Sequence, residues 1–331
     1  MRGMTPEREA LYREGLRAAT AAGQQVLLRG GTALDAAVAA VVSMENGGVF
    51  NAGLGSCLTG DGTVEMDAAV MRGADRGIGA VASIESVANP VLLAREVLNE
   101  TPHCVLAAGG AVAFAEARGL PLRADFPPPA RLAEWEQKKA RLEARTEGKS
   151  LEEGLAELGG VLGDQEDAPS QDTTFISSDP VGDKHDTVGA VACDARGGVA
   201  AAVSTGGIWL KMPGRVGDCP LPGAGFWALN DEGAAVATGT GESLMRVMIC
   251  KDVVDGIASH GDAQRAAEDS IALLEKHFGP DQGGVIAVAP DGEIGWALNT
   301  HGMGRGTWRD GMSEPAVAVW PNEVWDHAVQ R

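Results

Sequence analysis

Three threonines and one charged pair in the second half of the chain are the residues whose types could carry chemistry. Thr187 begins an apolar run, whereas Thr205 and Thr238 end apolar runs and are followed by glycine. A threonine hydroxyl is a weak nucleophile that needs an adjacent base, and a threonine at a strand start is by itself only a good β-former. Arg215 and Asp218 lie three residues apart in a Pro/Gly-rich loop. They could face one small zwitterionic group, or form only a surface ion pair worth under about 1 kcal/mol.

Several motifs occur in a fixed order along the chain and together carry a family resemblance. They are Phe50-Asn51-Ala52-Gly53-Leu54-Gly55, Val64-Glu65-Met66-Asp67-Ala68, Met71-Arg72-Gly73, Asn89-Pro90, His185-Asp186-Thr187, Ser204-Thr205-Gly206-Gly207, Pro213-Gly214-Arg215-Val216-Gly217-Asp218, Thr238-Gly239-Thr240-Gly241-Glu242 and Asn299-Thr300-His301-Gly302-Met303. The set resembles the plant-type L-asparaginases and isoaspartyl peptidases, a branch of the N-terminal-nucleophile (Ntn) hydrolases. Glycosylasparaginase and the threonine aspartase are more distant members of that group. The resemblance covers residues 10–120 and 185–310.

The resemblance implies an autocatalytic cleavage of the threonine-protease type between Asp186 and Thr187. Thr187 would then be an N-terminus and the nucleophile of a hydrolase. The cut frees an α-amino group beside the hydroxyl, and such an amine has a reference pKa of about 8, close enough to neutrality to accept the hydroxyl proton. One residue would thus supply both nucleophile and base.

The same resemblance implies roles for the residues around the nucleophile. Thr205 would hold the Thr187 hydroxyl. Thr238 and the Gly239 amide would form the oxyanion hole, where each donor is worth roughly 10²–10³ in rate. Asn51 would position Thr187 or a water molecule.

Substrate recognition, again by resemblance, would fall to Arg215, Asp218 and Gly241. Arg215 would grip an α-carboxylate as a bidentate fork and Asp218 an α-ammonium. This pair selects an amino acid whose side-chain amide is cut, that is, L-asparagine or a β-aspartyl dipeptide. Both substrates present the same aspartyl end, so the sequence does not rank them.

The elements that must position these residues fall into helices first, a polar segment, and then hairpins. Helices are expected from Pro6 to about Arg29, Ala33 to Met44, Pro90 to Asn99, Gly109 to Arg118, Glu242 to Ala258 and Asp262 to Phe278, and strands at Gly77–Ile84, Thr187–Asp194, Val199–Ser204, Ala224–Asn230, Ala234–Thr238, Val285–Val288 and Ile294–Leu298. Residues of about 125–186 are expected to form a mobile linker in which a segment such as Glu134–Lys139 could form a helix. Gly163–Asp183 has the polar, acidic composition of a linker. Hairpins with segregated helices favour an α+β class, and the resemblance implies a single four-layer αββα sandwich matured into residues 1–186 (α subunit) and 187–331 (β subunit).

Composition excludes several classes of partner. The formal charge of −19 argues against nucleic acid or an anionic membrane surface. No apolar run reaches the roughly 18 residues of a membrane span, and five scattered cysteines without CxxC spacing fit a reducing compartment. We therefore expect a cytoplasmic enzyme with no cofactor and no firm metal site. A sodium ion in the loop near Glu45 and Phe50, and a homodimer of processed α/β pairs, are further implications of the resemblance.

The chain departs from the family pattern at three places. The family begins with a strand carrying His-Gly-Gly-Ala-Gly, whereas this chain starts at the following helix, so the sheet is expected to lack one strand or the start to be misassigned. Asp186 replaces the glycine usual before the nucleophile. His301 and Gly304 stand where an acidic residue and a tyrosine are common. We do not expect Glu65 and Asp67 to act as a carboxylate pair.

Two alternatives to an asparaginase remain open from the sequence. His-Asp-Thr before the strand resembles glycosylasparaginase, so a glycosylasparaginase-like hydrolase is one alternative. An unprocessed, non-catalytic member of the fold that serves as a binding or scaffold module is the other.

Self-cleavage gives the first testable prediction. A mass spectrum of the purified protein under denaturing conditions should show two fragments, one of them beginning at Thr187. A single uncut chain would contradict autocatalytic maturation and favour the scaffold alternative.

Overall fold

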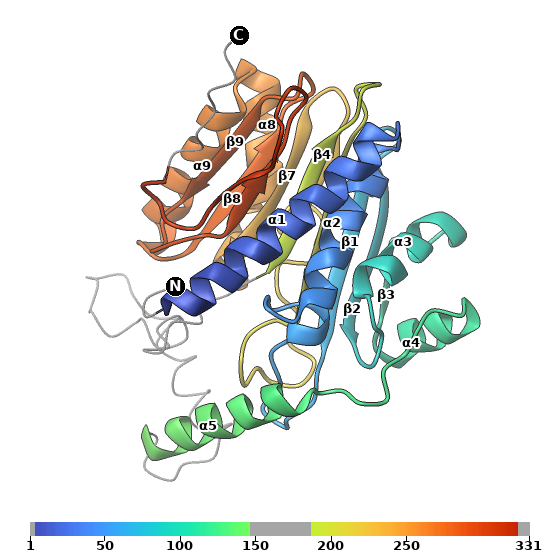
Figure 1. The fold of residues 1–331 in the computed structure, drawn as a ribbon, viewed down its shortest axis with the longest axis vertical. Coiled ribbons are helices and arrows are strands. Elements are labelled where there is room, and N and C mark those ends of the chain that lie inside the picture. The colour runs from blue at the N-terminus through green and yellow to red at the C-terminus, as the bar shows by residue number, and fades with distance from the viewer. Residues whose placement is uncertain (1–3, 146–186, 324–331) are drawn as a thin grey trace.

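The computed structural model describes residues 4–145 and 187–323, and both ranges are rich in regular structure (Figure 1). The helices are α1 (Pro6–Leu28), α2 (Ala33–Gly47), α3 (Pro90–Glu100), α4 (Ala108–Ala117), α5 (Pro129–Arg145), α7 (Gly241–Val247), α8 (Ile249–His260) and α9 (Ala263–Phe278), with a 3-10 turn at Gly53–Gly55. The strands are β1 (Met66–Arg72), β2 (Gly77–Ile84), β3 (Val105–Ala107), β4 (Val188–Cys193), β5 (Val199–Thr205), β6 (Phe226–Leu229), β7 (Gly233–Gly239), β8 (Gly283–Val288), β9 (Ile294–Leu298), β10 (Arg305–Thr307) and β11 (Ala316–Ala318). The predicted α+β class is confirmed.

The strands form three sheets, two of which face each other. One has five strands in the order β3-β2-β1-β5-β4, one has four in the order β6-β7-β8-β9, and β10 pairs with β11. Ala69 and Met71 of β1 share an apolar cluster with Phe226 and Val236 of the second sheet. Their neighbours Ala68 and Val70 belong instead to a cluster with the helices. Because successive side chains of a strand alternate between faces, β1 is buried on both sides.

Helices cover the outer faces of the two large sheets. Helix α2 contacts β4 and β5, and α3 contacts β1 and β2. Helices α8 and α9 contact β7, β8 and β9 on the other side, where Val253 and Leu274 are fully buried (Figure 1). Among the described helices, none combines the length and apolar character that a membrane crossing needs.

Local sequence signals explain most of the helix ends. The Thr5 side chain caps α1 with proline at its first position, and the Thr32 side chain caps α2 by accepting from the Asp35 amide. The prediction of one helix from Glu242 to Ala258 is wrong. Met248 adopts a left-handed backbone, with φ of +51°, and separates α7 from α8.

The region predicted as a mobile linker contains helix α5. Trp135 of this helix donates its indole N–H to the Thr59 carbonyl at 2.8 Å, and Arg131 and Lys138 lie over the ring of Trp209. Helix α5 is thereby attached to two loops of the body. Residues 146–186 of the predicted linker lie outside the described residues.

The packing of α9 on the second sheet predicts a clear stability difference between two leucines. Leu274 is fully buried, whereas Leu28 at the end of α1 is 57% exposed. Leu274→Ala should lower the free energy of unfolding by about 2–5 kcal/mol, because the lost contacts leave a cavity. Leu28→Ala is the matched control and should change it by less than about 0.5 kcal/mol. Denaturant unfolding followed by circular dichroism measures both, and equal effects would contradict the assigned core.

Candidate active site

The register of two strands places Thr187 beside Thr205. Strands β4 and β5 are antiparallel, with Val188 opposite Ser204. Thr187, the residue directly before β4, therefore lies beside Thr205. The Thr187 hydroxyl donates to Thr205 Oγ1 at 3.3 Å, and the Gly207 amide donates to the same oxygen at 3.0 Å. Thr205 is buried and Thr187 is half-buried. The hydroxyl of Thr187 is therefore held on one side and accessible on the other.

Asn51 holds the turn that follows Thr205. Its side-chain amide donates to the Gly207 carbonyl at 2.6 Å, its side-chain oxygen accepts from the Cys57 amide at 2.7 Å, and its backbone carbonyl accepts from Gly206. The described contacts of Asn51 thus go to this turn and to Cys57, and not to Thr187. Asn51 acts on the threonine pair through Gly207.

Arg215 and Asp218 converge on the backbone of Gly241. A Cβ atom added to Gly241 would lie 2.8 Å from Asp218 Oδ1 and 3.1 Å from Arg215 Nη2. A side chain at this position would press against both charged groups, so glycine lets them approach the Gly241 backbone. That the two charges bind one small zwitterionic group stays a prediction. The guanidinium of Arg215 also forms a bidentate pair with Glu242, with N–O distances of 2.9 to 3.0 Å.

Asp218 is the electrostatically unusual residue of this site. It is 4% exposed, and its Oδ2 has no hydrogen-bond partner among the described residues. Burial raises the pKa of Asp218 to about 7, against the opposing effect of Arg215. A buried carboxylate oxygen without a partner is costly, which favours the protonated form of Asp218.

Thr238 and Gly239 end strand β7, which runs toward Gly241 and hence toward Arg215 and Asp218. Gly239 has a φ of +149°, and a Cβ there would lie 2.2 Å from the Gln282 carbonyl oxygen. Strand β7 also contacts β4 across the two sheets. Thr238 and Gly239, the predicted oxyanion residues, therefore lie on β7, which faces β4. Strand β4 begins directly after Thr187. Asp186, the other predicted cleavage residue, lies outside the described residues.

The loop predicted to hold sodium gathers backbone carbonyls. A Cβ on Gly53 would lie 2.5 Å from the Glu45 carbonyl oxygen, and one on Gly55 would lie 1.9 Å from the Phe50 carbonyl oxygen. The Glu45 carboxylate points elsewhere, because it accepts from the Val91 amide and from Asn89, and burial raises its pKa to about 7. In the described ranges no group of three or more His, Cys, Asp or Glu could hold a metal ion.

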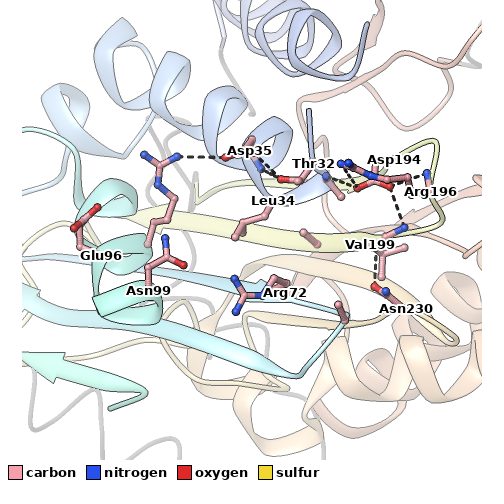
Figure 2. Close-up of a pocket in the computed structure, with 15 residues that line it drawn as sticks. Thr32, Leu34, Asp35, Arg72, Glu96, Asn99, Asp194, Arg196, Val199 and Asn230 are labelled. Carbon is pink, nitrogen blue, oxygen red and sulfur yellow. Dashed lines mark hydrogen bonds and ion pairs between the residues drawn. The ribbon is translucent and has the colours of Figure 1, made fainter. Parts of the chain in front are cut away.

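A separate cavity of about 520 Å³ lies at the other end of the same strands (Figure 2). Arg72 and Val199, at the ends of β1 and β5 remote from Thr205, line it. Its arginines already have acidic neighbours: Arg72 pairs with Asp75, Arg95 with Asp35 and Arg196 with Asp194. None of the predicted site residues lines this cavity.

Three charged residues of the site region were missed by sequence reasoning. They are Glu242, which pairs with Arg215, Lys211, which lies buried in the loop that carries Arg215, and Glu65, which lies buried beside that loop. The expectation that Glu65 and Asp67 do not act as a carboxylate pair stays a prediction, although both side chains lie against Ser83. Both carboxylates accept hydrogen bonds from Ser83, because residues two apart in an extended chain share a face.

Comparison with known proteins identifies the class to which this fold and site belong. The sequence matches the family described as Asparaginase over residues 1–317. It is 41% identical over 311 residues to a plant-type L-asparaginase of Thermococcus kodakarensis, covering 92% of each chain. It is 37% identical over 290 residues to an isoaspartyl peptidase/L-asparaginase of Homo sapiens, covering 88% of this chain and 84% of the human protein. The chain therefore belongs to the asparaginase family and is a hydrolase, which confirms the resemblance seen in its motifs.

The raised pKa of Asp218 predicts opposite effects of pH on activity and stability. The carboxylate must be ionised to bind an ammonium, so kcat/KM for an amino-acid substrate should fall as the pH drops through about 7. Folding is favoured by the protonated form, so the stability that Asp218 contributes should decrease as the pH rises from about 4 to about 7.

Asp218→Asn is the variant that checks this prediction. It should lower kcat/KM by about 100-fold or more, and it should flatten the change in unfolding free energy between pH 4 and pH 7. Initial rates and denaturant unfolding across this range provide the measurement. If the unfolding free energy of Asp218→Asn changed with pH as it does in the wild-type protein, Asp218 would not be the titrating group.

Proposed function

We propose that this protein is a self-cleaving amidohydrolase that releases L-aspartate from L-asparagine, from β-aspartyl dipeptides, or from both. The observation that carries the proposal is the Thr187–Thr205 hydroxyl pair, 3.3 Å apart, at the end of a sheet that also supports Arg215 and Asp218. Relatives named plant-type L-asparaginase and isoaspartyl peptidase/L-asparaginase, at 41% and 37% identity, support it.

Maturation would break the Asp186–Thr187 peptide bond and leave residues 1–186 and 187–331 as two subunits of one folded unit. The new α-amine of Thr187 then takes the proton of its own hydroxyl. Thr205 Oγ1, which also accepts from the Gly207 amide, holds that hydroxyl in place. We further propose that the described layers make up the four-layer αββα sandwich of Ntn hydrolases.

Hydrolysis would proceed in two steps on Thr187. The Thr187 oxygen attacks the side-chain amide carbon, and the negative charge that develops on the carbonyl oxygen is stabilised by Thr238 and the Gly239 amide. The C–N bond breaks, and ammonia or an amine leaves with the proton that the α-amine held. Water then attacks the acyl-enzyme, returns a proton to Thr187 and releases aspartate.

Arg215 and Asp218 would bind the aspartyl end of the substrate. An α-carboxylate would exchange with or join Glu242 at the Arg215 fork, and an α-ammonium would reach the free oxygen of Asp218. Gly241, which has no side chain, lets both charged groups approach its backbone. The same contacts serve asparagine and a β-aspartyl dipeptide, because the two substrates differ only beyond the amide nitrogen.

Two further parts of the proposal concern assembly and a cation. The processed pairs would form a homodimer. The carbonyl oxygens of Glu45 and Phe50, which converge on the Gly53–Gly55 turn, would suit a sodium ion with a structural role. Neither part contributes a step to the reaction.

A pair of substitutions at Thr187 tests the proposal. Thr187→Ala should abolish aspartate release from both substrates, with a loss of at least about 10³-fold. Thr187→Ser keeps a hydroxyl and should retain measurable cleavage and turnover. Aspartate release is measured with a coupled enzyme assay on L-asparagine, a β-aspartyl dipeptide and an aspartyl-glucosamine.

Each other outcome has a distinct meaning. Activity retained by Thr187→Ala would overturn the assignment of the nucleophile. Faster cleavage of the aspartyl-glucosamine than of the other two would favour the glycosylasparaginase-like alternative. No aspartate release by the wild-type protein would favour the unprocessed scaffold.

A further inference from the structure

The loop that carries Arg215 is held by a segment of the first half of the chain. This loop, residues 206–217, joins Thr205 to Asp218. The Leu210 amide donates to the Leu58 carbonyl at 2.9 Å, and the Gly60 amide donates to the Lys211 carbonyl at 2.8 Å. Residues 58–65 thus form a support against which the loop is aligned.

Glu65 makes the side-chain contact nearest to Arg215 in this support. Glu65 is only 8% exposed, and its Oε2 accepts a hydrogen bond from the Gly214 amide at 2.8 Å. Gly214 directly precedes Arg215 and has a φ of +83°. A buried carboxylate that accepts from a backbone amide makes a strong, directional hydrogen bond. It therefore fixes the Pro213–Gly214 peptide, one residue before the Arg215 side chain.

Ser83 fixes the orientation of Glu65 in turn. The Ser83 hydroxyl donates to the same Oε2 of Glu65 at 2.9 Å, and the Ser83 amide donates to Asp67 Oδ1 at 2.8 Å. Ser83 has a φ of +50°, and the β1–β2 ladder is irregular between Met66 and Ala68. A left-handed serine next to a bulge costs free energy, and here it turns both groups of Ser83 toward the two carboxylates.

Lys211 adds a charge to the same arrangement. Lys211 is only 2% exposed, and its ammonium donates a hydrogen bond to the Glu65 backbone carbonyl at 2.7 Å. Burial lowers the pKa of Lys211, while the nearby Asp67 and Glu65 oppose that effect. The loop is thus anchored to Glu65 twice, once through Lys211 and once through Gly214.

We propose that Glu65 is a positioning residue for substrate recognition, which sets the place of the Arg215 guanidinium through the Gly214 amide without touching the substrate. The inference rests on the proposed function, because it assumes that Arg215 binds the α-carboxylate of an aspartyl substrate. That carboxylate does not react, so its contact contributes equally to ground state and transition state. Loss of the correct position of the Arg215 guanidinium should therefore raise KM and leave kcat nearly unchanged.

Three variants separate this role from a structural one. Glu65→Ala removes the acceptor and should raise KM about tenfold or more, with kcat changed by less than about threefold. The inhibition constant of L-aspartate, which presents the same α-carboxylate, should rise by a similar factor. Glu65→Gln retains an amide oxygen for Gly214 and Ser83, so its KM should stay within about threefold of wild type. Glu85→Ala, at an exposed carboxylate two residues after Ser83, is the matched control and should behave as wild type.

The measurement is steady-state kinetics on L-asparagine and a β-aspartyl dipeptide. Rates are normalised to the fraction of chain cleaved before Thr187, which is determined by mass spectrometry. This normalisation separates slow maturation from weak binding. If Glu65→Ala fails to fold, Ser83→Ala decides, because loss of the orienting hydroxyl should still raise KM and the aspartate inhibition constant severalfold.

Several results would overturn the inference. A lower kcat with unchanged KM, a lower melting temperature with unchanged KM, or equal impairment of Glu65→Gln and Glu65→Ala would each do so. A wild-type protein that releases no aspartate would instead refute the proposed function. The two failures are therefore distinguishable.

Discussion

The antiparallel register of β4, β5 and β1 is the constraint on which the rest of the site depends. It places Val188 opposite Ser204 and Thr205 opposite Asp67, so Thr187, Thr205 and Asp67 form a row across one end of the sheet. Residues in such a row share a face of the sheet. A slip of one residue would turn these side chains to the other face. The extensive burial of β1 and β5 on both faces prevents that slip, because it would disturb two apolar clusters at once.

Buried charge at this end of the sheet is matched group by group, with few exceptions. Lys211 and Arg215 have acidic or carbonyl partners at hydrogen-bonding distance. A buried charge without a partner is strongly unfavourable, so this matching keeps the loop between Thr205 and Asp218 in one conformation before a ligand arrives. One oxygen of Asp67 and one of Asp218 have no hydrogen bond among the described residues. The Asp218 oxygen without a partner is Oδ2, whereas Oδ1 faces the backbone of Gly241.

Local signals in the sequence were enough to predict most helices and the three hairpins of the second half. Caps at Thr5 and Thr32 and turns such as Asp231-Glu232-Gly233 act over a few residues, so a short window contains them. Strand β1 was not predicted as a strand, although β5, which is also buried on both faces, was predicted from its apolar run. The break at Met248 was missed because neither glycine nor proline marks it. In the site, motif order identified the threonines, Arg215 and Asp218. The bonds of Glu65 to Gly214 and of Arg215 to Glu242 span 149 and 27 residues and leave no local pattern.

The continuity of the five-stranded sheet has a consequence for how the two parts of a processed chain would stay together. Strands β1, β2 and β3 precede Thr187, whereas β5 and β4 follow it, and β1 pairs with β5 in the middle of the sheet. A chain cut before Thr187 would keep this ladder. Its two pieces could separate only if the hydrogen bonds between β1 and β5 broke and the apolar clusters on both faces of the sheet became exposed. Dilution alone would not separate them. The five-stranded sheet is complete only when both pieces are present, so separately made fragments would have to fold on each other to form it, and the cut would change the covalent connectivity without creating two independent molecules.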